Sequence, residues 1–197
     1  IGVVDINPEQ GKKVSDELDV PFYLNFEEVI NKVDAVSIAV PTVHHYKSAK
    51  AFITNGVHVL LEKPFAETIE EAEELSQLSI DNNVSLQIGH LERFNPVFVE
   101  FQQLIDQPKF IENIRIAPFP KRGTDVDVIL DLMIHDIDLV LATVGEFPET
   151  VEGIGVNFVT SSSDLAKARL RFPCGCIADL TASRISDKAE RKMRIFQ

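Results

Sequence analysis

The tripeptide Glu62-Lys63-Pro64 is the first place where this sequence could carry chemistry. It directly follows residues 57–61, an apolar run typical of a buried strand, and therefore lies at the predicted carboxyl edge of a parallel sheet. Pro64 ends the strand and keeps Lys63 out of the helical conformation. A lysine held at that edge can give a proton to a substrate or take one from it. On the tripeptide alone, a loop lysine in contact with water is the simpler interpretation.

Asp131, His135 and Asp138 form a second polar set, spaced so that they share one face of a predicted helix. Most other positions between 128 and 141 are apolar, which makes the set a thin polar stripe on an apolar helix. A carboxylate one turn from an imidazole favours the charged ring and orients it. That arrangement suits hydrogen bonding to a hydroxyl whose proton leaves as a hydride departs. A helix edge that faces water is the alternative, and Asp136 is expected to be exposed or structural.

Further residues follow predicted strands and could line a cofactor. Asp5 ends the first strand; an acid at the end of the second strand of a dinucleotide fold hydrogen-bonds the ribose hydroxyls and repels a 2′-phosphate, which favours NAD over NADP. A turn aspartate is the alternative for Asp5. Pro41 and Thr42 follow the next strand, although a plain strand-to-helix turn would need no ligand there. Arg93 could orient substrate or cofactor, and an ion pair with Glu92 or with the neighbouring domain explains it equally well.

The first half of the chain alternates strands with helices. Near-continuous apolar runs predict strands covered on both faces, as in a parallel sheet, at residues 1–5, 35–40, 57–61 and 84–88. Helix starts between them are indicated by capping residues that have Glu or Gln three positions later, namely Asn7, Asn25 and Thr68. This order predicts a βαβαβ arrangement, which is half or more of a doubly wound sheet.

The pattern changes after Gly89. The elements expected there are a helix from Asn95-Pro96, a strand at 110–117, and a long helix from Thr124 to about Thr143 that ends near Gly145. A Pro173-Cys174-Gly175 turn between strand-like runs at 165–172 and 176–181 predicts an antiparallel hairpin. The chain is therefore predicted to be α/β, with a partial Rossmann doubly wound parallel sheet at 1–89. An α+β domain with a largely antiparallel open sheet is expected at 90–197.

Composition and charge exclude several kinds of partner. With 45% hydrophobic residues, a chain of 197 residues can bury the core of one or two domains. A net charge of −12 argues against nucleic acid and against an anionic membrane, and no run approaches the roughly 20 apolar residues that span a bilayer. Cys174 and Cys176 are spaced wrongly for a metal site or a redox pair, and the adjacent His44 and His45 suit no shared metal. We therefore expect no metal, no nucleic acid, no membrane, and reduced thiols in the cytoplasm.

Four stretches resemble, in this order, the Gfo/Idh/MocA family of oxidoreductases: residues 39–42, 62–64, 89–96 and 131–138. Each stretch is weak alone, but the ordered set covers essentially the whole chain. The resemblance implies an N-terminal NAD(P)-binding Rossmann domain and a C-terminal domain for substrate binding and oligomerisation. It also implies hydride transfer between nicotinamide and a hydroxyl or keto carbon of a sugar, polyol or nucleotide-linked sugar. Residues 89–96 and 131–138 look most similar to members acting on UDP-N-acetylhexosamines, and a homodimer or homotetramer is expected.

The resemblance also implies roles for individual residues. Lys63 corresponds to the lysine of the family's Glu-Lys-Pro motif, and Asp131 and His135 correspond to the acid and histidine of its Asp-x-x-x-His motif. Lys63 or His135 would then be the catalytic acid/base, with Asp131 in support, and Met133 stands where many members have glycine. The cofactor contacts implied in the same way are Asp5, Pro41, Thr42, His45, Glu62, Lys63 and Arg93.

Both ends of the chain are expected to be cut, because Ile1 begins within a strand without an initiator Met and the last residues are strand-like. The glycine-rich strand-to-helix turn that normally begins the family would then precede Ile1. Since that turn holds the cofactor pyrophosphate, residues 1–197 alone are predicted to bind NAD poorly. A non-catalytic NAD-binding sensor or regulator of the same fold stays open as an alternative, as does an enzyme acting on a non-sugar carbonyl such as a dihydrodiol.

Overall fold

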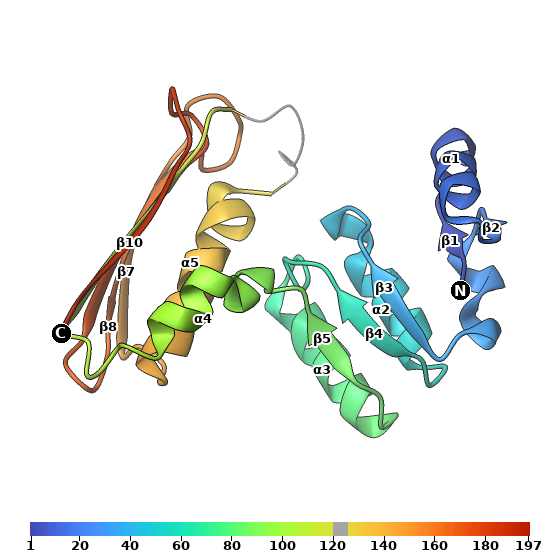
Figure 1. Ribbon diagram of the computed structural model, residues 1–197, viewed down its shortest axis with the longest axis horizontal. Helices are drawn as coiled ribbons and strands as arrows, with labels where there is room; N and C mark the ends of the chain where they lie inside the picture. The colour runs from blue at the N-terminus through green and yellow to red at the C-terminus, as the bar shows by residue number, and fades with distance from the viewer. Residues whose placement is uncertain (120–125) are drawn as a thin grey trace. The chain divides into compact units, whose positions relative to one another are not determined.

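The computed structural model describes residues 1–119 and 126–197, which form two compact units. The first unit comprises Ile1–Gly89 and the second comprises His90–Gln197 (Figure 1). Each unit has a hydrophobic core of its own. The predicted fold class is confirmed, because parallel Rossmann-like strands are followed by a largely antiparallel sheet.

The first unit begins with a small parallel pair of strands, β1 (Val3–Val4) and β2 (Phe22–Tyr23), joined by helix α1 (Pro8–Leu18). Asn7 caps α1 as predicted, because its side chain accepts two backbone N–H groups of the first turn. The sequence does not predict β2, since two residues are too few to show the alternation that marks a strand. β1 and β2 form a two-stranded sheet that is separate from the main sheet of this unit.

The main sheet of the first unit has three parallel strands in the order β3 (Ala35–Ile38), β4 (His58–Leu61) and β5 (Leu86–Ile88). Helices α2 (His45–Ile53) and α3 (Ile69–Asp81) connect these strands. This part of the unit matches the predicted alternation of strands and helices, and it places three strand ends at one edge of the sheet.

The capping residues predict where helices of the first unit begin. The Thr68 hydroxyl accepts the backbone N–H of Glu71 at 3.2 Å and begins α3. Asn25 also begins helical backbone, but two 3-10 helices follow it, η1 (Phe26–Glu28) and η2 (Ile30–Lys32), in place of an α-helix. A capping signal therefore marks the first turn and does not determine how long the helix continues.

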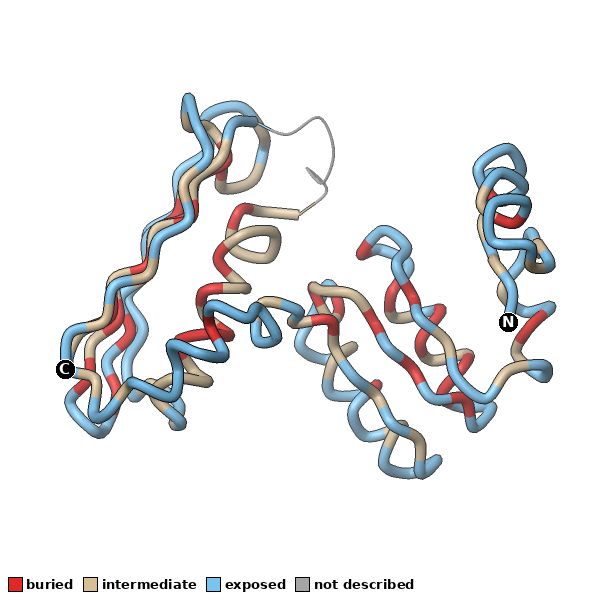
Figure 2. Tube along the Cα trace, viewed as in Figure 1, coloured by how far each residue is buried: buried red, intermediate tan, exposed pale blue. Residues whose placement is uncertain are grey.

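The expectation that the strands are covered on both faces is wrong for the described residues. Helices α2 and α3 cover one face, where Val59 and Leu61 are 3% and 0% exposed. On the other face Ser37 and His58 are exposed, and Leu60 is 42% exposed. Buried and exposed residues therefore alternate along the trace of these strands (Figure 2). The apolar runs hide an alternation in which every second side chain points away from the helices.

The second unit is built on a five-stranded sheet in the order β10-β6-β9-β8-β7. Its strands are β6 (Phe110–Ile116), β7 (Thr150–Val156), β8 (Leu165–Arg171), β9 (Ile177–Ser183) and β10 (Glu190–Phe196). The β6–β9 pair is parallel, and the other three pairs are antiparallel. The predicted hairpin of β8 and β9 is confirmed; its turn has Gly175 at a φ of 86°, which glycine adopts without strain.

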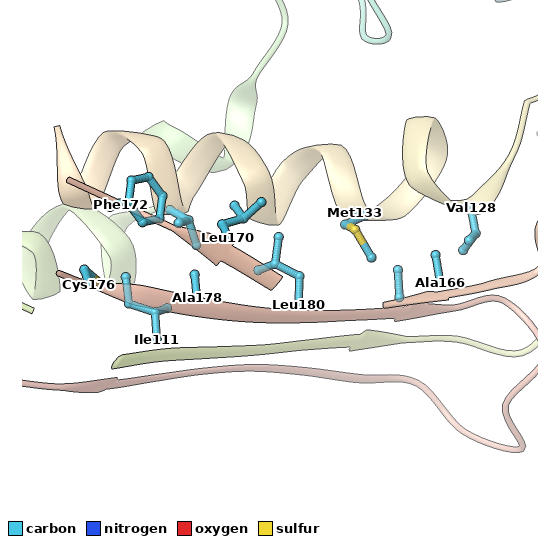
Figure 3. Packing of buried hydrophobic residues seen from close by; sticks show 11 residues of the cluster. Ile111, Val128, Met133, Ala166, Leu170, Phe172, Cys176, Ala178 and Leu180 are labelled. Carbon is cyan, nitrogen blue, oxygen red and sulfur yellow. The ribbon is translucent and has the colours of Figure 1, made fainter. Parts of the chain in front are cut away.

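The helices of the second unit are η4 (Leu91–Phe94), α4 (Pro96–Gln102), the π-helical turn η5 (Ile129–Met133) and α5 (Ile134–Val144). Met133, the last residue of η5, and Val128, the residue before η5, point onto the sheet, where they pack with Ala166 and Leu180 (Figure 3). All four side chains belong to residues that are at most 1% exposed. The apolar side of this helix is thus fixed against the sheet.

The long helix of the second unit begins after Asp127, whose Oδ1 accepts the N–H groups of Ile129 at 3.0 Å and Leu130 at 2.9 Å. Thr124, its predicted start, lies outside the described residues. The helix ends at Gly145, as predicted. Its first turn is π-helical, which the sequence does not predict.

Candidate functional site

The turn that carries Lys63 lies at the carboxyl edge of the main sheet of the first unit, as its position after an apolar run predicts. The Glu62 N–H donates to Ile38 O at 2.9 Å, which holds the turn beside the end of β3. Lys63 is half-buried, and its peptide bond to Pro64 is cis. A half-buried lysine at a sheet edge is suited to exchange a proton with a bound molecule.

Gly89 follows β5, and the Glu62 carboxylate lies against it. A Cβ added at residue 89 would lie 3.0 Å from Glu62 Oε2, closer than these atoms normally approach. Glycine at this position therefore allows the Glu62 side chain to lie over the end of β5. The contact joins residues 62–64 to residue 89, two of the stretches on which the family resemblance rests.

His45 lies inside the first unit, between the turns that follow β3 and β4. The residue is 1% exposed; its Nδ1 lies 2.7 Å from Pro64 O and its Nε2 lies 2.9 Å from Val40 O. Both ring nitrogens therefore face backbone carbonyl groups of the protein. The ring is thus enclosed by the protein, and a contact between His45 and the cofactor stays a prediction.

Asp5, Pro41 and Thr42 lie where strands of the first unit end. Asp5 is half-buried after β1, and its Oδ1 accepts the N–H of Asn7 at 2.8 Å, so the carboxylate also supports the turn into α1. Pro41 is exposed, and the buried Thr42 begins the 3-10 helix η3 (Thr42–His44) that leads into α2. A contact between these residues and a cofactor stays a prediction.

Asp131 and His135 are both half-buried and lie on either side of the junction between η5 and α5. Ile134 donates its N–H to Ile129 O, five residues earlier, so residues four apart in this turn do not stack as they would in an α-helix. Such π-helical turns are frequent at functional sites, and the catalytic roles of Asp131 and His135 stay predictions.

Asp138 does not belong to an open polar stripe, because its carboxylate is buried and pairs with an arginine that is half-exposed. The residue is 8% exposed, and its carboxylate accepts from Arg93 Nε at 2.7 Å and Nη2 at 2.6 Å. These hydrogen bonds are the main reason why the pKa of Arg93 is raised. Of the roles left open for Arg93, the structure shows an ion pair, but with Asp138 on α5 in place of Glu92.

Asp136 is buried and structural, so the alternative that it is exposed is wrong. It is 5% exposed and accepts from Arg115 Nε at 3.0 Å and Nη2 at 2.8 Å. Glu92 forms an ion pair with the same arginine, with its Oε1 3.3 Å from Arg115 Nη1. Burial lowers the pKa of Arg115, but Asp136 and Glu92 outweigh burial and raise it.

The sequence contains a signal for Arg115 that lies outside the motifs described above. Within β6, residues Ile111, Asn113 and Arg115 alternate inward and are 0%, 2% and 6% exposed. An arginine at an inward position of an alternating strand requires a buried acidic partner. That requirement would have indicated a carboxylate on the covering helix, although not which one.

Asp164 and Arg184 form a second buried pair that sequence reasoning missed, and both are 0% exposed. Arg184 Nε donates to Asp164 Oδ1 at 3.0 Å, and Arg184 Nη1 donates to Val126 O at 2.7 Å. Burial raises the pKa of Asp164, but backbone N–H groups of Thr160 and its two preceding residues outweigh burial and lower it. The pair fixes the backbone immediately before the helix that carries Asp131 and His135.

Within residues 1–119 and 126–197, no three side chains of His, Cys, Asp or Glu are grouped as ligands for a metal ion. Across the same residues, no helix has the length and apolar character needed to cross a membrane. Cys174 is an exposed free thiol and Cys176 a buried one, and burial is the main reason why the pKa of Cys176 is raised.

Comparison with protein families covers most of the chain. Residues 1–90 match the oxidoreductase family with an NAD-binding Rossmann fold, and residues 112–196 match the GFO/IDH/MocA C-terminal domain. The chain belongs to the Gfo/Idh/MocA family. The resemblance inferred from four short stretches is confirmed in both units.

Members of the Gfo/Idh/MocA family similar to this chain include named dehydrogenases. UDP-N-acetylglucosamine 3-dehydrogenase of Acidithiobacillus ferrooxidans is 40% identical over 196 residues, which are 99% of this chain and 63% of that relative. A solved structure of that enzyme has a TM-score of 0.93 and is matched over 99% of this chain and 65% of its own. The scyllo-inositol 2-dehydrogenase (NAD(+)) of Bacillus subtilis is 27% identical over 169 residues, 78% of this chain and 49% of that protein. The chain thus spans less than two thirds of these relatives.

Proposed function

We propose that the protein containing this chain is an NAD-dependent dehydrogenase of a nucleotide-linked sugar, with a UDP-N-acetylhexosamine as its substrate. The observation that carries this proposal is 40% identity to a UDP-N-acetylglucosamine 3-dehydrogenase over 99% of the chain. The presence of Lys63, Asp131 and His135 supports it, because they are the residue types that the reaction needs. A sugar or polyol without a nucleotide is the second substrate class to test, given the similarity to an inositol dehydrogenase.

The cofactor side of the proposal rests on the carboxyl ends of the parallel strands. NAD, when bound, supplies the hydride acceptor. Asp5 fits a role at the ribose hydroxyls, because a half-buried carboxylate stands after β1 and Asn7 orients one of its oxygens. Pro41, Thr42 and Glu62 follow β3 and β4 at the edge where such sheets bind ligands. The same carboxylate disfavours a 2′-phosphate, so NAD is favoured over NADP.

The proton side of the proposal rests on Lys63 and His135. Oxidation of a secondary alcohol removes a hydride from carbon and a proton from the hydroxyl oxygen. Lys63 or His135 takes that proton as the general base, and Asp131 supports the imidazole. In the reverse direction the same residue returns the proton to the alkoxide that forms as the hydride arrives.

The test is steady-state turnover of the full-length protein with NAD and UDP-N-acetylglucosamine, followed by NADH absorbance. Lys63→Ala and His135→Ala are each expected to lower kcat by about 10²- to 10⁴-fold, the usual contribution of a general acid/base. Exposed residues of the same types serve as controls: Lys47→Ala on α2 and His58→Ala at the amino end of β4. Wild-type protein that binds NAD tightly but turns over no sugar, polyol or nucleotide sugar would instead identify a sensor.

We further propose that the protein is a homodimer or homotetramer that assembles through the open face of the five-stranded sheet. On this face the strand register places four charged residues in one row: Arg194, Glu112, Asp179 and Arg169. Arg194 pairs with Glu112 at 2.8 Å and Arg169 with Asp179 at 2.6 Å, while the four side chains stay 34–50% exposed. Light scattering on wild type and Arg169→Glu tests the assembly, and a monomeric wild type would contradict it. The two free thiols support a cytoplasmic location as part of the same proposal.

A further inference from the structure

We propose that His45 is a positioning residue, which sets the place of Lys63 by holding the Lys63–Pro64 turn to the turn after β3. The inference rests on the proposed function, since it assigns to His45 a part in the proton transfer by Lys63. His45 touches neither substrate nor cofactor in this proposal. It acts through the backbone of the adjacent turn.

The geometry of the ring supports this role. The two carbonyl groups that it contacts, Val40 O and Pro64 O, belong to segments 24 residues apart in the chain, after two neighbouring parallel strands. Pro64 has no N–H, so its own amide cannot continue the pairing that links Glu62 to β3. The His45 ring supplies a further connection one residue beyond Lys63.

The anchor of the ring is rigid. His45 is the first residue of α2, and the same helix buries Ala49, Phe52 and Ile53 at 0–2% exposure in the core of the first unit. A ring fixed on such a helix restricts the position of the Lys63–Pro64 turn to a smaller range than a residue on a loop could. A displacement of about 1 Å at a catalytic group can cost on the order of 10²-fold in rate, so this connection has kinetic consequences.

The two ring nitrogens make separable contributions. A neutral imidazole carries one N–H and a doubly protonated one carries two, whereas both carbonyl oxygens can only accept. The Nδ1 contact, 2.7 Å to Pro64 O, is the one that reaches the Lys63 turn. The Nε2 contact, 2.9 Å to Val40 O, stays within the turn that leads into α2. The proposal assigns the positioning of Lys63 to the Nδ1 contact.

Two substitutions separate these contacts in the full-length protein. The side-chain nitrogen of Asn stands the same number of bonds from Cα as Nδ1, and that of Gln the same number as Nε2. His45→Asn can therefore still donate to Pro64 O, and His45→Gln can donate only to Val40 O. With NAD and UDP-N-acetylglucosamine, kcat is expected to fall by roughly 10- to 100-fold in His45→Gln and to stay near wild type in His45→Asn, with the KM for NAD unchanged in both. His58→Asn, an exposed histidine of β4, is the matched control.

Equal kcat in the Asn and Gln variants would overturn the proposal, because a merely structural role makes no distinction between the two nitrogens. If wild type oxidises no substrate, the proposed function fails, and the inference is then judged on the chemical reactivity of Lys63. Competitive reductive methylation read by mass spectrometry is expected to change at Lys63 in His45→Gln but not in His45→Asn, with the exposed Lys47 as reference. Unchanged Lys63 reactivity in His45→Gln would overturn the inference.

A measurement on wild type covers the case in which the variants do not fold. Protein labelled with 15N-histidine is expected to show a slowly exchanging N–H on Nδ1 of His45, because the proposal places a proton on this nitrogen, which lies 2.7 Å from Pro64 O in a buried residue. A His45 ring without a protected Nδ1 proton would sink the proposal, whatever the kinetics of the variants.

Discussion

The turn that carries Lys63 and the helix that carries His135 are held in place by different chemistry. In the first unit one buried imidazole contacts two backbone carbonyl groups. In the second unit guanidinium groups pair with aspartates that are at most 8% exposed: Arg115 with Asp136, Arg93 with Asp138, and Arg184 with Asp164. The ion pair Lys50–Glu74 of the first unit lies at its surface.

The difference follows from what surrounds each element. The Lys63 turn is at the end of a sheet whose strands already pair by backbone hydrogen bonds, and the His45 ring adds a further connection. The His135 helix lies across a sheet and shares no backbone hydrogen-bond ladder with it, so its rotation and translation must be set by side chains. Apolar packing fills the interface without direction, whereas a buried ion pair has a demanding geometry. Removing the charge of a paired arginine or aspartate should therefore lower the stability of the second unit more than that of the first.

Replacing Arg184, which is fully buried, should lower the free energy of unfolding more than the other substitutions. Arg184→Met leaves the Asp164 carboxylate without its guanidinium partner and is expected to lower the free energy of unfolding of the second unit by about 3–5 kcal/mol. Urea denaturation followed by circular dichroism measures this change. Arg171→Met, which removes an exposed arginine of β8, is the matched control and should cost less than about 1 kcal/mol. Equal effects of the two substitutions would refute the role given to burial.

Acid should affect the second unit before the first. The pKa of Asp164 is held below its usual range, so its contribution to stability is present above pH of about 4 and is lost as pH falls toward the folded value. The protection factors of the β8 and β9 amides, in which the slower intrinsic exchange in acid is divided out, are expected to fall on acidification. Fluorescence of the two tyrosines of the chain, Tyr23 and Tyr46, should change later, since both lie in the first unit.

Asp164→Asn provides the control for this acid response. Without the titrating carboxylate, the protection factors in β8 and β9 should depend less steeply on pH, even though the variant is less stable at neutral pH. Simultaneous loss of both units in wild type, or an unchanged pH dependence in Asp164→Asn, would show that Asp164 does not govern the acid sensitivity.

The smallest loss of stability is expected for the pair of Arg93 and Asp138, which is partly exposed to solvent. The Arg93 side chain is 48% exposed, and Asp138→Asn keeps the size of the residue while it removes the charge. The free energy of unfolding of the second unit should fall by about 1 kcal/mol, because solvent screens a half-exposed pair. A loss as large as that of Arg184→Met would mean that Asp138 holds η4 and α5 together more firmly than its exposure suggests.

Much of the fold could be predicted because its signals are local. The caps at Asn7 and Thr68, the turn at Gly175 and the helix end at Gly145 each depend on a few neighbouring residues. The two-residue strand β2 and the π-helical turn η5 could not be predicted, since β2 exists through pairing with β1 and η5 has the composition of an ordinary helix. The strands of the main sheet were expected to be buried on both faces because their alternation is masked by Ala and Leu at exposed positions.

The sequence by itself determined the family, the order of the elements and the candidate residues Lys63, Asp131 and His135, because residue type and spacing along the chain are enough to recognise them. Only the tertiary structure decided how polar residues are partnered. It showed that the His45 ring contacts two turns, and that Asp138, expected in a polar stripe, is the partner of Arg93. The physical reason is that a hydrogen bond or ion pair depends on distances between residues far apart in sequence, here 19 for His45 and Pro64 and 45 for Arg93 and Asp138.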